Sequence, residues 1–517
     1  MLPILTPLFE VLACLGFGAL ILKPLGFARW LRADEIITWS FGLGFGVLGW
    51  LTFLFGWAGF FGKLQLAILI LSGLPFVILL RQETVSVWRK FCNWTPNLVE
   101  KLCLAGIVLV FAFDVIEAIP PPSDADTLAY HFALPKTYLA QERLEFVPRA
   151  IDGAVPLLVN MTYVPALALG GERGLTLWTM ISGWFAGALF LSLCLRYLTP
   201  KWSISTVLIF FTTPAVIYSS GSGHVEVRLT LFAIIGALSV AQAIKTGDWR
   251  FALIAGLAAG FFMGGKYTGL LFAAAAGAVI LFQRRWLNHG LAMALGGAIA
   301  GCQWYLWNWV HTGDPVFPVL YNYLKDIIDY RYWDQAHADS LRDLYFAHET
   351  PLERTLLGLI SYPFIATLAG LPQFESGRTG FGPLVLLLLP FVTMSIWINR
   401  KKILTHEIFP LATILLIFYV TWFLSGSSQK VRHMLPVYPL LLVCFAIASE
   451  RLVHINFRGP ITSVFAATLG LQIVIVMLFS VNSAKYVFYR ESNKSYLTRT
   501  VSGFSPVPWI NNNLSMD

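Results

Sequence analysis

The stretch LTLWTMISGWFAGALFLSLC, residues 175–194, carries no charge over the length that a helix needs to cross the hydrocarbon of a bilayer. Similar apolar runs recur at residues 229–244, 381–398 and 461–479. They are too long and too numerous for the core helices of a soluble domain. They also lack the alternation of polar and apolar residues that marks the strands of a membrane barrel. The pattern predicts an all-α polytopic membrane protein with about fourteen transmembrane helices.

The composition agrees with this class. Of the 517 residues, 57% are hydrophobic and only 12% are charged, whereas soluble domains carry roughly 25% charged residues. The six cysteines lie in or beside apolar runs without CxxC spacing, so neither a disulfide framework nor a zinc site is predicted. The first apolar run, residues 2–22, has no basic segment before it and is expected to be a retained span rather than a signal peptide.

The basic residues predict the orientation of the helices. With the N-terminus outside, the short inside loops hold eighteen basic residues and the short outside connections hold five, as the positive-inside rule requires. Both termini then lie outside, provided that residues 356–371 form a surface or re-entrant helix. The net charge of +8 thus reflects topology and gives no reason to expect nucleic acid as a partner. The inside residues are Lys23, Arg29, Arg32, Arg81, Arg89, Lys90, Lys101, Arg196, Lys201, Lys245, Arg250, Arg284, Arg285, Arg400, Lys401, Lys402, Arg451 and Arg458.

This topology divides the chain into five regions. Residues 1–101 and 381–480 are expected to form transmembrane helices, residues 311–380 a large outer loop and residues 481–517 an outer tail. Between them, residues 102–310 are expected to form a transmembrane core that carries the first outer loop, residues 120–174. The inside loops contain no P-loop and no GxGxxG segment, so ATP is not predicted as an energy source. Long polar segments on one side favour chemistry at the outer membrane surface.

The first outer loop carries the acidic candidates. Pro120–Pro122 must end the preceding span, because proline cannot continue a helix. A new helix, capped by Ser123, Asp124 or Asp126 and broken near Pro135, is expected to follow. A carboxylate at the membrane interface is suited to take a proton from a hydroxyl group or to hold a cation. The alternative, that both aspartates serve only as caps, stays open.

Three later positions carry the other candidates. Glu226 and Arg228 lie just before a span, where they could also snorkel or pair with each other. Lys266 interrupts two apolar helices, and its ammonium group could bind a lipid phosphate. Arg432 and His433 lie at the outer end of a late span, and arginine suits bidentate contact with phosphate oxygens. Topology alone would also allow these cations to be interface anchors.

Four motifs of the chain resemble those of bacterial GT-C glycosyltransferases, the group that includes aminoarabinose transferases and protein O-mannosyltransferases. Each motif is short, but their order and shared outer location cover roughly residues 100 to 450. The motifs are DTLAYHF at 126–132 followed by Pro135 and Lys136, GGKYT at 264–268, TGDPVFP at 312–318, and RHMLP at 432–436.

The resemblance implies a GT-C-like fold and an inverting transfer of a sugar from a polyprenyl-phosphate donor. The acceptor would be a glycan, a lipid or a protein outside a bacterial inner membrane, with the active site facing the periplasm or the exterior. It further implies that Asp126 activates the acceptor, with Asp124 as its neighbour. The donor phosphate would be held by Lys266, Arg432 and His433. Substrate contacts are expected from Tyr130, His131, Glu226, Arg228 and Tyr267.

The chain also departs from this pattern. Glu226 stands where relatives often have an aspartate, and Arg228 follows it. The DxD spacing of Asp124 and Asp126 leaves a divalent cation open, but many relatives need none, so no metal ligand is assigned. Residues 508–513 resemble the beginning of an outer soluble domain of some relatives.

Three other functions compete with transfer. A flippase or transporter for polyprenyl-linked glycans would have a similar number of helices, but it is expected to carry ionisable groups near the bilayer midplane. An O-antigen polymerase or ligase would also use polyprenyl donors, with basic residues in one large late loop. A membrane scaffold without activity is the third alternative.

Overall fold

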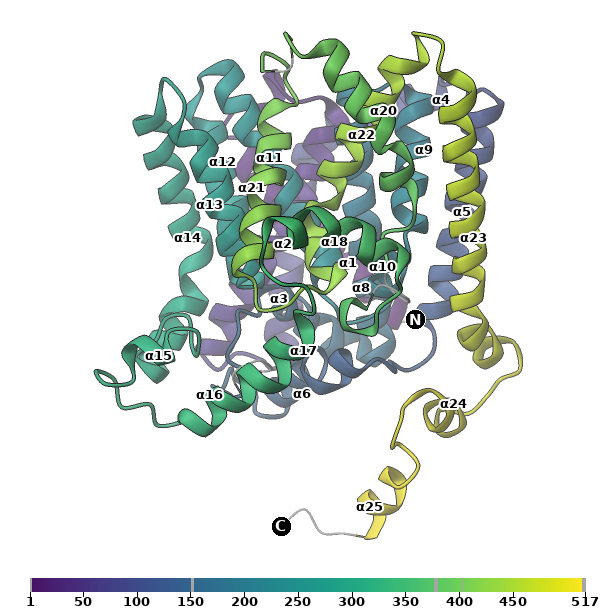
Figure 1. The fold of residues 1–517 in the computed structure, drawn as a ribbon. Coiled ribbons are helices and arrows are strands. Elements are labelled where there is room, and N and C mark those ends of the chain that lie inside the picture. Colours follow the sequence, from purple (N-terminus) through teal and green to yellow (C-terminus); the bar gives the residue numbers. More distant parts are fainter. Residues whose placement is uncertain (1, 150–152, 376–379, 403, 514–517) are drawn as a thin grey trace.

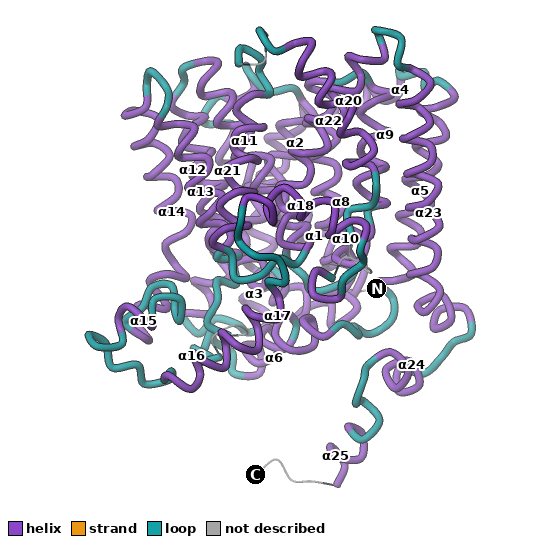
Figure 2. The backbone as a smooth tube through the Cα atoms, in the orientation of Figure 1, coloured by secondary structure: helices purple, strands orange, loops and turns teal. Residues whose placement is uncertain are grey.

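The computed structural model describes residues 2–149, 153–375, 380–402 and 404–513, and no strand occurs among them. The long helices run side by side in one bundle (Figure 1). Figure 2 shows that helices and connecting loops make up the whole described chain. Seven helical segments are long and apolar enough to cross a membrane. They are Pro3–Leu22 in α1 (Leu2–Leu22), α2 (Ala33–Trp57), Lys63–Cys92 (α3, Lys63–Gly73; η2, Leu74–Leu80; α4, Arg81–Cys92), α8 (Tyr163–Tyr197), α11 (Glu226–Thr246), Val431–Val453 (η6, Val431–Val437; α22, Tyr438–Val453) and α23 (Arg458–Phe488).

Seven further apolar helices lie in the bundle, which brings the described total to fourteen and confirms the predicted all-α polytopic class. The shortest of them, α9, continues into α10 (Pro214–Ser220) across Pro214. The seven are α5 (Leu98–Ala118), α9 (Pro200–Thr212), α12 (Trp249–Gly265), α13 (Thr268–Leu281), α14 (Trp286–Thr312), α20 (Leu384–Asn399) and α21 (Phe409–Ser425).

The short helices gather mainly at one end of the bundle, the lower end in Figure 1. We call this the loop end, defined by residues 119–149, 153–157 and 313–349, and the opposite end, with the basic loops, the basic end. The elements of the loops and of the tail are η3 (Thr127–His131), α6 (Ala133–Ala140), α7 (Leu158–Met161), α15 (Tyr321–Leu324), α16 (Gln335–Leu341), η4 (Arg342–Phe346), α17 (Ala347–Glu349), α18 (Leu356–Leu368), η5 (Pro372–Phe374), α24 (Asn493–Thr500) and α25 (Val507–Asn513).

The region after α5 follows the predicted order with one correction. The helix ends at Ala118, just before Pro120–Pro122, as expected. The break expected near Pro135 lies three residues earlier, at Phe132, and Pro135 stands in the first turn of α6. Proline is tolerated there because the N–H groups of a first helical turn have no partner within the helix.

Helix α18 is too short to span a bilayer, since its thirteen residues reach only about 20 Å. One face is held by Tyr362, whose hydroxyl donates to the carbonyl oxygen of Gln429 at 2.8 Å. The other face exposes Leu357, Ile360 and Leu368. An exposed apolar face on a short helix is what the prediction of a surface or re-entrant segment requires.

Helix α11 forms the centre of the bundle, since almost every one of its residues is buried. Beside it, α12 and α14 approach so closely that a Cβ atom at Gly256 would collide with the backbone of Met293. Small residues permit this kind of contact between membrane helices. At the far end of the chain, α23 continues to Phe488, so eight residues that the sequence assigned to the tail belong to the helix.

Candidate functional site

The first acidic turn lies directly after α5, and its two aspartates have different contacts. Asp124 Oδ1 accepts a hydrogen bond from the backbone N–H of Thr127 at 2.9 Å, so Asp124 caps η3. Asp126 caps nothing, and its side chain is 30% exposed. Asp124 therefore serves as a cap and Asp126 does not.

A second turn, residues 221–225 between α10 and α11, packs against the first. The backbone N–H of Gly223 donates to Thr127 Oγ1 at 2.8 Å. A Cβ atom at this position would collide with His131, so glycine is needed for the approach. The contact leaves His224 Nε2 3.3 Å from Asp124 Oδ1.

Arg432 in η6 joins both turns from a position 306 residues further along the chain. Its Nη1 donates to Asp126 Oδ2 at 2.6 Å and to His224 Nδ1 at 3.0 Å. Because arginine can only donate, His224 Nδ1 must accept, and its Nε2 is then the nitrogen that carries a proton towards Asp124.

Lys266 reaches the same place from the connection between α12 and α13. Its ammonium group pairs with Glu226, and Glu226 Oε1 lies 3.9 Å from Arg432 Nε. The structure therefore brings Asp126, Lys266 and Arg432 together, with Glu226 between the two cations. The Glu226 side chain is 1% exposed, whereas that of Lys266 is 23% exposed. We call Asp124, Asp126, His224, Glu226, Lys266 and Arg432 the charge cluster.

Arg228 does not pair with Glu226, and the reading that they pair or snorkel is wrong. The two residues are separated by two positions on a helix and so point in different directions. The guanidinium group of Arg228 is fully buried and donates to the carbonyl oxygens of Thr179 and His224. Arg228 thus fixes the second turn to α8.

The large outer loop adds a carboxylate to this set. Glu375 Oε2 lies 3.4 Å from Arg432 Nε, and Glu375 Oε1 lies 3.1 Å from Lys430 Nζ. Lys430 also binds Glu349 at 2.8 Å. The sequence analysis assigned no role to His224 or Glu375. The sequence offered a clue to His224, because this residue lies two positions before Glu226 in a turn of glycine and serine. Glu375 lies in no recognisable motif.

The other predicted substrate contacts lie around the charge cluster. His131 is buried, with its Nδ1 2.9 Å from Asn160 Nδ2, and this contact fixes η3 to α7. The ring of Tyr130 lies 4.0 Å from the ring of His131. Tyr267 follows Lys266, and its hydroxyl donates to the carbonyl oxygen of Phe317 at 2.9 Å. Tyr267 therefore supports the chain beside Lys266.

The TGDPVFP motif forms a turn beside the charge cluster. Asp314 is fully buried, and its carboxylate accepts from the backbone N–H of Val316 at 2.9 Å and from the hydroxyl of Tyr330 at 3.2 Å. Burial raises the pKa of the Asp314 carboxyl above its usual value. The motif thus has a structural role in this fold.

The charges of the first turn follow from its neighbours. Burial by itself would raise the pKa of Asp126, but the charge and hydrogen bond of Arg432, together with the neighbouring histidines, outweigh burial and lower the pKa to about 2. Burial also opposes ionisation of Asp124, yet its contacts with His224 and Thr127 lower its pKa. Burial lowers the pKa of His131 to about 3. At neutral pH both aspartates are ionised and His131 is uncharged.

Several buried polar atoms of this region make no hydrogen bond within the described part of the chain. Among them are His224 Nε2, Glu226 Oε2, Arg432 Nε and His433 Nδ1. A buried polar atom without a partner costs about 1–3 kcal/mol, so such atoms need an explanation. The charge cluster therefore has unused capacity for a ligand that both accepts and donates hydrogen bonds. Within the described residues, no group of three or more His, Cys, Asp or Glu could hold a metal ion.

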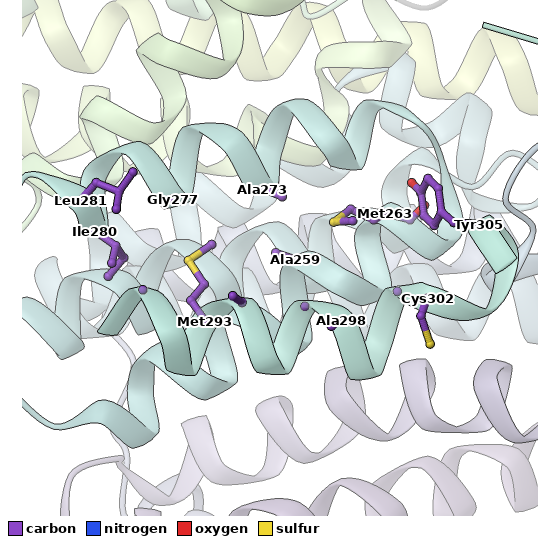
Figure 3. Close-up of a pocket in the computed structure, with 14 residues that line it drawn as sticks. Ala259, Met263, Ala273, Gly277, Ile280, Leu281, Met293, Ala298, Cys302 and Tyr305 are labelled. Atoms are coloured by element: carbon purple, nitrogen blue, oxygen red, sulfur yellow. The ribbon is translucent and has the colours of Figure 1, made fainter. Parts of the chain in front are cut away.

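An apolar groove of about 520 Å³ runs between α12, α13 and α14 (Figure 3). Met263 and Tyr305 lie at one end of the groove and Ile280 and Leu281 at the other. Met263 comes one helical turn before Lys266, so the groove ends beside the charge cluster. The lining is almost wholly apolar, as a hydrocarbon chain requires.

The fold and the charge cluster define a multi-pass helical membrane protein with an ionic site at one end of its bundle. No known family profile matches the chain, and no curated protein matches it. Among solved structures, the chain is similar to the crystal structure of ArnT from Cupriavidus metallidurans bound to undecaprenyl phosphate. The two share 14% sequence identity over 80% of each chain, with a TM-score of 0.49. The functional argument therefore rests on the geometry of the charge cluster.

Proposed function

We propose that the protein is a GT-C type glycosyltransferase that moves a sugar from a polyprenyl-phosphate donor to an acceptor. The transfer takes place on the extracytoplasmic side of a bacterial inner membrane. The observation that carries this proposal is the meeting of Asp126, Lys266 and Arg432 at the loop end. Transfer from a phosphate-linked donor needs a base for the acceptor and cations for the leaving phosphate.

The donor phosphate binds the exposed faces of Lys266 and Arg432, and His433 contributes its unpaired Nδ1. The polyprenyl chain lies in the groove between α12, α13 and α14, whose end at Met263 leads to Lys266. This arrangement keeps the hydrocarbon in the membrane and the sugar among the loops.

The reaction is a single displacement. The acceptor oxygen forms a bond to the anomeric carbon while the bond from that carbon to the phosphate oxygen breaks. Asp126 takes the acceptor proton, and the bonding electron pair leaves with the polyprenyl phosphate. Negative charge grows on the phosphate in the transition state, so preorganised cations stabilise it more than they stabilise the bound donor. One displacement without a carboxylate nucleophile inverts the anomeric centre.

The pair between Asp126 and Arg432 couples donor binding to base strength. In the free protein Arg432 holds the pKa of Asp126 at about 2, so this carboxylate is a weak base. A bound phosphate draws Arg432 towards itself. The loss of that neighbouring charge raises the pKa of Asp126 and makes it a better proton acceptor. The base therefore gains strength only when the donor is present.

The test is a transfer assay with Asp126→Asn in proteoliposomes. The substrates are polyprenyl-phosphate-linked hexoses and pentoses with a membrane lipid extract, and the readout is released polyprenyl phosphate. Loss of the base should lower the rate by about 100-fold or more, because general base catalysis contributes that much. The matched control is Asp326→Asn, an exposed aspartate of the loop end, which should leave the rate unchanged.

Donor binding is measured separately with polyprenyl phosphate. Asp126→Asn should bind it at least as tightly as the native protein does, because Arg432 no longer pairs with this carboxylate, whereas Lys266→Ala should bind it more weakly. Lys325→Ala removes an exposed lysine of the same end and serves as the control. Full turnover in Asp126→Asn, or native binding in Lys266→Ala, would contradict the assigned roles.

A further inference from the structure

A second cavity, polar rather than apolar, lies on the other side of the first acidic turn. It has a volume of about 490 Å³, within the usual range of small-molecule sites. The walls are the turn at Pro120–Asp124, the end of α10 with the residues after it, and the outer ends of α23 and α24. Most of the lining groups can form hydrogen bonds, among them Ser123, Asp124, Thr176, Ser222, Asn482 and Ser483.

This cavity shares a wall with the charge cluster. Asp124 lines the cavity, and its carboxylate also contacts His224 at 3.3 Å. Tyr218 lines it too, and its ring lies 5.3 Å from the ring of His224. His224 in turn contacts Arg432. A ligand in the cavity therefore lies against Asp124, which connects through His224 to Arg432.

Helix α24 forms one wall of the cavity and is held in place by several contacts. Arg499 donates to Glu491 Oε2 at 2.7 Å and to the carbonyl oxygen of Asn482 at 2.8 Å, so it ties the tail to the end of α23. Tyr496 is buried against Tyr486, with ring centroids 5.2 Å apart. The Ser492 hydroxyl caps the helix. These contacts order the wall that faces the cavity.

The charges of the cavity select the kind of ligand. Glu117 and Asp124 bring two carboxylates to the lining, and the only lining cation among the described residues, Arg499, is bound by Glu491. A phosphate or carboxylate group would meet repulsion there. Hydroxyl groups can donate to carboxylates and exchange hydrogen bonds with the serine, threonine and asparagine side chains.

We propose that this cavity binds the acceptor, and that the acceptor presents a neutral, hydroxyl-rich sugar unit. The proposal rests on the proposed function, since it assigns the second substrate of that reaction. Donor and acceptor then reach the charge cluster from opposite sides of the first acidic turn. The donor comes along the apolar groove that ends beside Lys266, and the acceptor comes through the polar cavity that Asp124 lines.

The test is saturation-transfer NMR on the full chain in lipid nanodiscs, because common maltoside detergents are themselves glycosides. The probes are methyl α-glucopyranoside, methyl α-mannopyranoside and methyl β-galactopyranoside, with glucose 1-phosphate as the anionic comparison. Ser483→Trp fills the cavity from α23, and Thr500→Trp fills it from α24. Val481→Trp adds the same side chain to an exposed position of α23 outside the cavity.

At least one methyl glycoside should give a signal with the native chain and with Val481→Trp, and both cavity variants should lose it. An equal signal in Ser483→Trp and Thr500→Trp would overturn the proposal. So would the absence of any glycoside signal, or stronger binding of glucose 1-phosphate.

Failure of the proposed function gives a different result. If the protein transfers nothing and does not bind polyprenyl phosphate, the glycoside signal should still be present in Lys266→Ala and in the native chain. If Asp126-dependent transfer occurs but Thr500→Trp leaves the acceptor KM unchanged, the cavity assignment fails alone.

Discussion

The two ends of the bundle use the same charged residue types in different ways. At the basic end, ion pairs join neighbouring helix ends, and each charged group has few partners. Lys23 binds Glu83 at 2.7 Å, and Arg196 makes two hydrogen bonds to Glu35 at 2.6 and 2.7 Å. At the loop end, Arg432 alone lies within 4 Å of three carboxylates and also contacts His224.

This difference separates structural pairs from a site. The pair of Arg196 and Glu35 satisfies its charge-assisted hydrogen bonds and leaves no reason for a ligand. The charge cluster instead shares its charges and leaves polar atoms of Glu226, Arg432 and His433 without hydrogen bonds in the described chain. A phosphate or sugar can take up those bonds. We therefore expect substitutions at the basic end to change stability and substitutions at the loop end to change activity.

The largest expected effect is on transfer in Arg432→Gln. The amide keeps some hydrogen bonding but loses the charge that stabilises the leaving phosphate, so the rate should fall by about 100-fold or more. The free energy of unfolding should fall by up to about 2 kcal/mol, the contribution of the pair with Asp126, so the rate is compared per folded molecule. Polyprenyl phosphate release and an unfolding curve of the same preparation measure both. If Arg432→Gln transfers sugar at the native rate, the charges of the loop end would be structural, like those of the basic end.

The next effect is on stability in Glu35→Gln. Glu35 is fully buried, and the change leaves Arg196, only 14% exposed, without its counter-charge. Removing one partner of such a pair should cost about 3 kcal/mol of unfolding free energy, the low end of the range for buried pairs because Arg196 is partly exposed. Lys245→Ala is the control, since its pair with Glu407 is half exposed and contributes less than about 1 kcal/mol. Transfer per folded molecule should be native in both variants, and a rate loss in Glu35→Gln without unfolding would argue against a purely structural pair.

The fold could be predicted from the sequence because the features that determine it lie within single segments of the chain. Apolar length and basic loops act on single segments, and they led to fourteen helices with the site residues at one end. Pairing within the site was harder. The pairing of Glu226 with Arg228 could have been rejected from helix geometry alone, but the choice of Lys266 as the partner depends on how α11 and α12 pack.

The remaining site residues show the same limit. Asp124 was one of three predicted caps, together with Ser123 and Asp126, because capping uses the next few residues of the chain, and its bond to Thr127 identifies it as the cap. Glu375 was missed because its contact with Arg432 depends on the path of the large outer loop, which no short motif encodes. The turn at TGDPVFP was read as part of a family pattern, and only the buried contacts of Asp314 reveal its structural role.

The smallest expected effect is the acid dependence of stability that Asp126 contributes. Its pKa in the folded protein is about 2, below the ordinary value of 3.8. A depressed pKa stabilises the fold above the ordinary value, and this contribution is lost as the pH falls through the folded value. The native chain should therefore lose up to about 2 kcal/mol more than Asp126→Asn between pH 5 and pH 2, roughly the interval that brackets both values. Thermal unfolding in nanodiscs across that range measures the difference, with Asp326→Asn as the control for loss of one carboxylate. The stability of Asp126→Asn and of the native chain could instead fall equally between pH 5 and pH 2. Arg432 would then not hold this carboxylate in its ionised form, and the proposed gain in base strength on donor binding would have no basis.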